Sequence, residues 1–229
     1  MKVFSVFLAI ILLIISCISI SSIPTVKEQD YNEFTIIIDA GHGGEDGGAV
    51  AFDGTYEKDI NLQIATKLNE FLSLLGYNTH MVRTEDLALH NDGLDTIRAR
   101  KNSDLKNRLK LMDIYKQCYY VSIHQNKYDD SNIWGAQVFY SPNNSQSKEL
   151  AEILQATIIN NLQHENHRKI KPSGTNIFIL YKAIKPAVMI ECGFVSNAND
   201  LYNLKDNLYQ NKLAFTISQA IVNYKISEA

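Results

Sequence analysis

Short apolar runs alternate along this chain with longer segments in which apolar residues recur every three or four positions. The short runs predict β-strands over residues 34–39, 78–83, 118–123, 136–140, 177–181 and 187–191. The helical spacing predicts α-helices over residues 57–75, 94–116, 145–163 and 206–224. Such alternation is typical of a sheet covered by helices on both faces. We therefore expect an α/β fold, a three-layer sandwich with a mostly parallel or mixed six-stranded sheet flanked by helices.

The N-terminus has a different pattern. Residues 3–20 contain no charged side chain and follow a lysine, so they suit either a secretory signal or a helix that crosses a bilayer. The segment also resembles a weak bacterial lipobox, in which Cys17 would be lipidated after cleavage. We assign residues 1–22 to this signal or membrane anchor, residues 23–33 to a polar linker, and residues 34–226 to one folded domain. All three readings place the domain outside the cytoplasmic membrane.

Composition narrows the function classes. Of 229 residues, 45% are hydrophobic and 21% charged, which is typical of a folded globular protein. The formal net charge of -3 and the absence of Gly-rich nucleotide motifs give no reason to expect nucleic acid as a partner or a nucleotide cofactor. Cys118 and Cys192 lie in strand-like runs without a CxxC pair, so we expect buried apolar side chains rather than a disulfide or metal ligands.

Four polar residues stand where the predicted elements end or begin. His42 follows the first strand between glycines, and His124 and Glu191 each end a later apolar run. Glu57 starts the best-defined helix on its apolar face, where a carboxylate needs compensation from the helix dipole or from a cation. If the strands are parallel, all four side chains meet at one edge of the sheet.

Two histidines and one carboxylate suit a catalytic zinc ion, because that set leaves one coordination position open. A second carboxylate off the metal can take a proton from water and return it to a leaving amine. Taken singly, each of these residues is accounted for by an ordinary turn, cap or core role. Their joint placement predicts a metallohydrolase.

The same residues carry a resemblance to a known family. From residue 34 to the last helix, the chain resembles the zinc-dependent N-acetylmuramoyl-L-alanine amidases of the amidase 3 type. The motifs that carry it match in order and spacing: residues 39–49 (DAGHGGEDGGA), 57–62 (EKDINL), 74–77 leading to 83–84, 105–108 (LKNR), 122–126 (SIHQN), 186–187 and 191–197 (ECGFVSN). Two positions depart from the family pattern, because Ala40 stands where relatives usually have proline and Gln125 where they usually have alanine. Neither is a ligand position, so we expect only a tuned site wall.

The resemblance implies that His42, Glu57 and His124 bind one zinc ion (Zn2+) and that Glu191 is the catalytic carboxylate. Glu45 is a rival for the metal or proton-shuttle role, but it lies on a glycine-rich loop that holds a side chain less rigidly.

Further polar residues surround these positions. Four lie next to the expected ligands, where they either orient the imidazoles or fill ordinary turn and capping roles: Asp39, Asp46, Asn61 and Asn126. Arg83 and Arg108 are expected to form structural ion pairs. The basic segment of residues 167–171 is either a solvated loop or a contact for anionic wall polymer.

The implied reaction is hydrolysis of the amide between N-acetylmuramic acid and L-alanine in peptidoglycan. The compact size and anchor-like N-terminus look most like the spore-cortex members of the family, which remove stem peptides before muramic-δ-lactam forms. A zinc peptidase or carboxypeptidase acting on wall peptides, and a non-catalytic wall-binding module, remain alternatives. The lack of a wall-binding repeat also suggests a protein partner for recruitment or activation. We expect membrane association on the outer side of the cytoplasmic membrane, including the space between forespore and mother cell.

Overall fold

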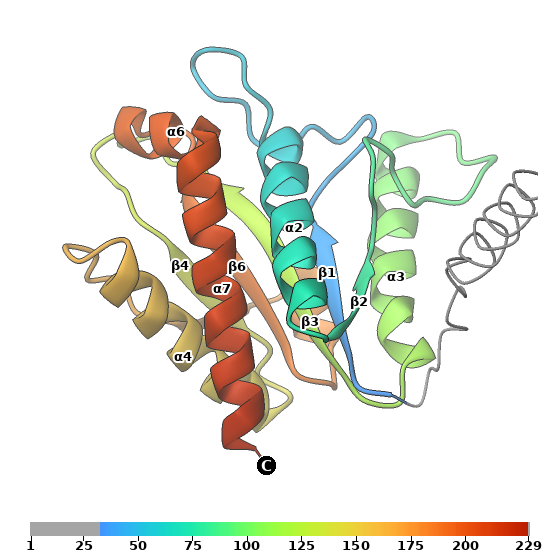
Figure 1. Cartoon of the computed structure of the whole chain (residues 1–229). Coiled ribbons are helices and arrows are strands. Elements are labelled where there is room, and N and C mark those ends of the chain that lie inside the picture. Colours follow the sequence, from blue (N-terminus) through green and yellow to red (C-terminus); the bar gives the residue numbers. More distant parts are fainter. Residues whose placement is uncertain (1–32, 229) are drawn as a thin grey trace, which may run out of the picture. The chain divides into compact units, whose positions relative to one another are not determined.

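The computed structural model describes residues 33–228, which fold around one six-stranded sheet (Figure 1). The strand order is β2-β1-β3-β6-β4-β5, and β4 runs antiparallel to β6 whereas the other pairs are parallel. The strands are β1 (Thr35–Ala40), β2 (Asn78–Met81), β3 (Cys118–Asn126), β4 (Gln137–Tyr140), β5 (Lys171–Pro172) and β6 (Ala187–Phe194). The expected α/β fold with a mixed six-stranded sheet is thereby confirmed.

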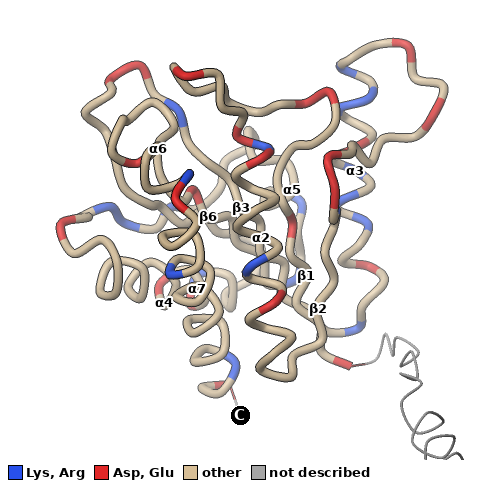
Figure 2. Tube along the Cα trace, turned by 45° about the horizontal axis from the view of Figure 1, so that its top comes forward, with Lys and Arg blue, Asp and Glu red and all other residues tan. Residues whose placement is uncertain are grey.

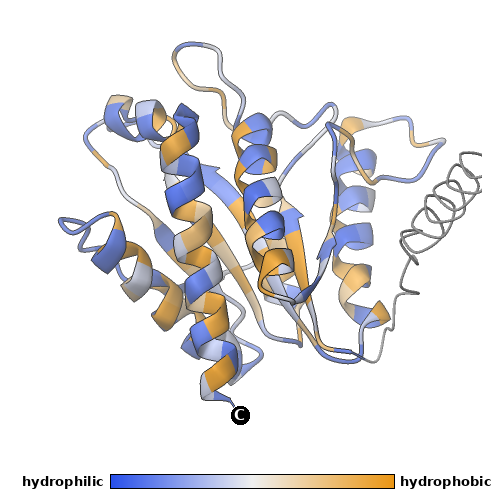
Figure 3. Cartoon of the chain, viewed as in Figure 1, coloured by the Kyte–Doolittle hydropathy of each residue, from blue (hydrophilic) through white to orange (hydrophobic). Residues whose placement is uncertain are grey.

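Helices cover both faces of the sheet. They are α2 (Glu57–Leu74), α3 (Ile97–Ile114), α4 (Ser145–Asn161), α5 (Phe178–Lys182), α6 (Ala198–Lys205) and α7 (Asn207–Ser227). Side chains alternate between the two faces because successive residues of a strand point in opposite directions. Ile36 and Ile38 of β1 pack in the larger core with α2, α4 and α7, whereas Ile37 packs with α3 and α5. The central strands β1, β3 and β6 therefore carry apolar residues on both faces (Figure 3).

The charged residues lie mainly on the helices and loops that surround the sheet. Figure 2 shows Lys and Arg interspersed with Asp and Glu along these segments, while the central strands are almost entirely uncharged. Several of these charges form ion pairs between neighbouring elements, as Lys58 does with Asp86 and Lys205 with Asp53.

The strand expected at residues 177–181 is wrong. The structure places α5 there, with Ile179 and Leu180 buried and Tyr181 exposed. Ala183, which follows the helix, is buried in the same core. A short apolar run fits a buried strand and a buried helix turn equally well, because periodicity cannot separate the two over five residues. The sixth strand is instead β5, two exposed residues that carry no apolar signal.

Cys118 and Cys192 are free and buried, as the sequence predicted. No helix within residues 33–228 is long and apolar enough to cross a membrane. The N-terminal segment of residues 1–22 and nearly all of the linker lie outside the described residues, so those assignments stay predictions.

Candidate active site

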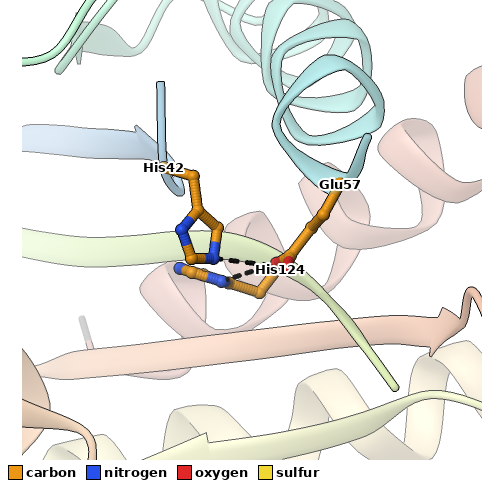
Figure 4. Close-up of side chains that lie close together, drawn as sticks. All are labelled: His42, Glu57 and His124. Atoms are coloured by element: carbon orange, nitrogen blue, oxygen red, sulfur yellow. Dashed lines mark hydrogen bonds and ion pairs between the residues drawn. The ribbon is translucent and has the colours of Figure 1, made fainter. Parts of the chain in front are cut away.

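The parallel strands bring His42, Glu57 and His124 together at the carboxyl edge of the sheet. His42 follows β1, His124 lies near the end of β3, and Glu57 is the first residue of α2 (Figure 4). One donor atom from each lies within 4.8 Å of the others. Glu191 of β6 stands directly opposite His124 in the register of the two strands. The structure thus brings together all four residues singled out in the sequence.

Glycines are required near the cluster because the backbone passes very close to its side chains. A Cβ atom on Gly41 would lie 2.1 Å from Nε2 of His124, so no larger residue fits beside that ring. A Cβ atom on Gly48 would lie 2.6 Å from Oε2 of Glu57. His42 itself has a φ of 62°, a left-handed conformation that non-glycine residues seldom adopt. Such a backbone persists only where surrounding contacts hold it.

Two arginines supply those contacts. Arg108 donates hydrogen bonds to the carbonyl oxygens of His42 (2.6 Å) and Ala40 (3.0 Å), and it pairs with the buried carboxylate of Asp39. Arg83 donates to the carbonyl oxygens of Ala40 (2.8 Å) and Gly41 (3.0 Å). Both guanidinium groups are buried. They satisfy the carbonyls of the turn that would otherwise be orphaned, and so they fix the turn that carries His42.

This finding corrects the expected role of one arginine. Arg108 forms the expected ion pairs, with Asp39 and with Asp104. Arg83 instead acts through backbone carbonyls, including that of Lys58 at 2.8 Å.

Glu57 is the electrostatic centre of the cluster, because its carboxylate is only 3% exposed and receives donors on both oxygens. Oε1 accepts hydrogen bonds from the backbone N–H of Gln125 (3.0 Å) and lies 2.9 Å from Nδ1 of His124. Oε2 accepts from the backbone N–H of Ala49 (2.8 Å) and lies 3.3 Å from Nε2 of His42. Burial alone would raise the pKa of Glu57, but the two imidazoles outweigh it and hold the pKa far below its ordinary value. The two imidazoles and two backbone N–H groups together stabilise the buried anion.

Asp46 contributes to the same balance. Its Oδ2 lies 2.9 Å from Nδ1 of His42, an ionic contact rather than a well-directed hydrogen bond. Burial favours the neutral imidazole, yet Asp46 and Glu57 together raise the pKa of His42 to about 9. Asp46 also pairs with Lys101 at 3.2 Å.

The other candidate neighbours divide into two groups. Asn61 donates to the carbonyl oxygen of Gly41 (3.1 Å) and to Oε1 of Glu57 (3.3 Å), so it braces the cluster from α2. Asn126 does not reach an imidazole: its side chain accepts from the backbone N–H of Lys127. The rival carboxylate, Glu45, is held on the surface by Nε and Nη2 of Arg100.

Glu191 differs from Glu57 in having no hydrogen bond within the described residues, and its Oε2 is buried without a partner. Burial raises the pKa of Glu191 to about 7, with Glu57 adding to the shift and His124 opposing it. A carboxyl group with such a pKa can both accept and release a proton near neutral pH.

A pocket of about 250 Å³ opens beside the cluster on the sheet face that α3 and α5 cover. His42 and His124 form one wall. The lining also includes five apolar residues: Leu105, Ile177, Phe178, Ile179 and Met189. The pocket gives a substrate access to the imidazoles, with apolar surface for an uncharged portion of it.

Comparison with known proteins identifies the family. Residues 36–223 match the family described as N-acetylmuramoyl-L-alanine amidase. The chain belongs to this family. The amidase is 33% identical over 189 residues to the germination-specific N-acetylmuramoyl-L-alanine amidase of Bacillus subtilis (strain 168), and the alignment covers 82% of this chain and 78% of the relative.

Solved structures agree with this placement. The amidase superposes on the CwlD amidase from Clostridioides difficile, whose structure was determined in complex with the GerS lipoprotein, with a TM-score of 0.81 and 38% identity. That match covers 84% of this chain and 98% of CwlD. An N-acetylmuramoyl-L-alanine amidase from Clostridium difficile 630 matches with a TM-score of 0.75 and 31% identity, covering 86% of this chain and 100% of the other.

The sequence did not reveal how the turn of His42 is held. Arg108 and Arg83 lie 66 and 41 residues from His42 along the chain, so local pattern carries no sign of their hydrogen bonds to residues 40–42. The signal that could have revealed these hydrogen bonds is burial. Arg83 and Arg108 lie within predicted elements, and an arginine that is buried there must have hydrogen-bond or charge partners.

Proposed function

We propose that this amidase hydrolyses the amide bond between N-acetylmuramic acid and L-alanine in peptidoglycan, with one zinc ion held by His42, Glu57 and His124. The observation that carries the proposal is the convergence of these three donor groups within 4.8 Å, next to the unpaired carboxylate of Glu191. Membership of the amidase family supports the reaction and its substrate.

The residues present fit a zinc ion. Two imidazoles and one carboxylate are a set that catalytic zinc sites use, with one position left open. Ligand atoms about 2.0–2.1 Å from a tetrahedral zinc ion are separated by roughly 3.3 Å. The carboxylate of Glu57 lies 3.3 Å from His42 and 2.9 Å from His124, close to that separation. A dication between these groups would also compensate the buried charge of Glu57.

The division of labour between the two glutamates follows from their surroundings. Zinc, when bound, polarises the scissile carbonyl and stabilises the negative charge that develops on its oxygen. Glu191 takes a proton from the attacking water on a carboxylate oxygen and delivers it to the nitrogen of the departing L-alanine. Glu57 cannot share this task, because its two oxygens are already engaged by backbone N–H groups and imidazoles.

The test is digestion of peptidoglycan by the full-length chain, purified in mild detergent and loaded with zinc. Mass spectrometry should identify free peptides that begin with L-alanine. We expect Glu191→Gln to reduce their release at least about 100-fold without loss of bound zinc, because general acid–base catalysis supplies roughly 100- to 10,000-fold. Glu45→Gln is the control: it makes the same change at an exposed glutamate three residues from His42 and should leave activity near wild type.

Other outcomes would redirect the proposal. Peptides cut at internal bonds would favour a wall peptidase, and no cleavage by the zinc-loaded protein would favour a binding role or a missing partner. Cleavage that is equal in wild type and Glu191→Gln would refute the role of Glu191.

The biological setting belongs to the same proposal. The germination-specific relative and the CwlD structure support a role in spore-cortex maturation, upstream of muramic-δ-lactam. The capture of CwlD with a lipoprotein supports recruitment or activation by a protein partner. Deleting the gene should lower muramic-δ-lactam in spores, and unchanged content would contradict this setting.

The N-terminal assignments complete the proposal. Residues 1–22 would export the chain or anchor it at the outer side of the cytoplasmic membrane, residues 23–33 would act as a linker, and residues 34–226 would be the catalytic domain. Accessibility of the chain to externally added protease in intact cells would test this placement, and full protection would contradict it.

A further inference from the structure

The polar row at the edge of the sheet continues beyond Glu191. His124 of β3 stands opposite Glu191 of β6, and Glu191 in turn stands opposite Gln137 of β4. Residues directly opposite one another in neighbouring strands project from the same face of a sheet. The side chain of Gln137 therefore lies on the same face as the active-site pair, one strand farther on, at a spacing of about 4.8 Å.

Gln137 is buried and both ends of its amide are engaged. Its Nε2 donates to the carbonyl oxygen of Lys169 at 2.7 Å, and its Oε1 accepts from Nη2 of Arg168 at 2.8 Å. The backbone N–H of Arg168 donates to the side chain of Asn166 at 2.9 Å. These contacts fix the position of the Arg168 guanidinium next to the strand that carries Glu191.

The guanidinium of Arg168 is oriented but its charge is not matched. Its Cζ lies over the ring of Phe194, 4.8 Å from the centroid. Nε is buried without a hydrogen-bond partner, and within residues 33–228 the single hydrogen bond of the group is the one from Nη2 to Gln137. Glu191 and Asp200 act on Arg168 through space, yet neither forms an ion pair with it in the described part of the chain. Holding an arginine in this state costs free energy that packing alone does not require.

We propose that Arg168 binds the free α-carboxylate of the second stem residue of the substrate. This inference rests on the proposed amidase function. When the scissile amide lies over Glu191, the stem peptide leaves on the side of its nitrogen, and the α-carboxylate of the next residue lies about 6 Å away. One strand spacing from Glu191 to Gln137 followed by a hydrogen bond to Arg168 spans a similar distance. The guanidinium of Arg168 is a charged, planar donor, and its Nη1 donates no hydrogen bond within residues 33–228, so Nη1 is the nitrogen that can bind a carboxylate.

The proposal makes Arg168 a specificity-determining residue. A stem with D-glutamate at its second position offers the carboxylate, whereas a stem with D-isoglutamine presents a neutral amide at the same place. Loss of a charge-assisted hydrogen bond reduces binding by roughly 10- to 100-fold. The difference should appear in KM more than in kcat, because the carboxylate lies away from the reacting atoms.

The experiment compares two soluble glycan substrates that differ only in D-glutamate or D-isoglutamine at the second stem position. The full-length, zinc-loaded chain should cleave the D-glutamate substrate with a kcat/KM about 10- to 100-fold higher. Arg168→Met should lower kcat/KM for that substrate to the level of the other, and Arg168→Lys should restore part of the preference. Lys169→Met, which removes an exposed charge from the neighbouring residue, is the matched control and should keep the preference.

The possible outcomes distinguish a failure of the role of Arg168 from a failure of the proposed amidase function. Equal cleavage of both substrates by the wild type would overturn the role of Arg168 and leave the amidase function standing. If Arg168→Met slowed both substrates to the same extent, the arginine would be purely structural. If the wild type cleaved neither substrate at the muramyl amide, the proposed function and the inference would fail together. The wild-type comparison needs no variant, so the test survives even if Arg168→Met fails to fold.

Discussion

Replacing Arg108 with methionine tests whether the turn of His42 is held by a buried charge network. Arg108 is 2% exposed and pairs with Asp39, which is 1% exposed. Burial alone would raise the pKa of Asp39, but the charge of Arg108 and a hydrogen bond from Ser122 keep the pKa below the ordinary 3.8. Arg108→Met leaves that carboxylate buried without its cation, a change that costs about 3–5 kcal/mol.

The destabilisation caused by the unpaired carboxylate has an upper limit that depends on pH. Asp39 can become neutral by taking up a proton, which costs about 1.36 kcal/mol for each pH unit above its unfolded pKa of 3.8. The upper limit is therefore about 4.4 kcal/mol at pH 7 and about 1.6 kcal/mol at pH 5. Loss of the donors to Ala40 and His42 adds about 1 kcal/mol each, independently of pH.

The sign of the pH effect differs between the two proteins. In the wild type the pKa of Asp39 is lowered, so its contribution to stability is present above the unfolded pKa and is lost as pH falls through the folded pKa. In Arg108→Met the buried carboxyl group has a raised pKa, so the folded variant gains relative stability as pH falls. The difference in unfolding free energy between wild type and Arg108→Met should narrow from pH 7 to pH 5 by about 1–3 kcal/mol.

Urea unfolding followed by circular dichroism at several pH values measures this difference. Adding Asp39→Asn to Arg108→Met removes the titrating group, so the double variant should show a gap that does not change with pH. A gap of constant size between wild type and Arg108→Met from pH 7 to pH 5 would refute the reasoning, as would a total cost below about 1 kcal/mol.

Two further predictions concern the site itself. Gly41→Ala places a Cβ 2.1 Å from Nε2 of His124 and should abolish activity. Gly54→Ala is the control: Gly54 has a positive φ but nothing within 4 Å of its added Cβ, so the change should cost only about 1 kcal/mol of stability and keep activity. Equal activity in both variants would contradict the close approach. Glu57→Gln should lower zinc affinity at least about 100-fold, measured by competition with a chromophoric chelator, because the carboxylate is a proposed ligand and balances both imidazoles; unchanged affinity would exclude it as a ligand.

Much of the framework was predictable because a parallel sheet buries its strands on both faces. Residues 36–38 and 187–190 are continuous apolar runs, and their flanking glycine and polar residues mark where the strands end. The strand ends located His42, His124 and Glu191, and the inward face of the helix located Glu57. Each position followed from local pattern, and parallel topology then brought the four together.

The elements that escaped prediction were short. β5 is Lys171–Pro172, two exposed residues that form a strand only through pairing with β4. α6 did carry a signal, because the side chain of Asn197 caps the backbone N–H groups of Asn199 and Asp200. The apolar run at residues 177–181 was wrongly predicted as a strand, because five residues are too few for periodicity to distinguish a strand from a helix.

Two arginines form hydrogen bonds near the site with residues that are distant along the chain, which explains why the sequence alone did not show these contacts. Arg108 reaches the turn of His42 from α3, and Arg168 reaches Gln137 from the segment between α4 and β5. Arg108 pairs with Asp39, 69 residues away along the chain, as well as with Asp104 on its own helix, whereas the guanidinium of Arg168 bonds to the neutral Gln137, 31 residues away. The first arginine is fully paired and fixes the backbone, whereas the guanidinium of the second donates a single hydrogen bond in the described part of the chain. That contrast in hydrogen bonding, visible only in three dimensions, separates an arginine that supports the fold from one available to a ligand.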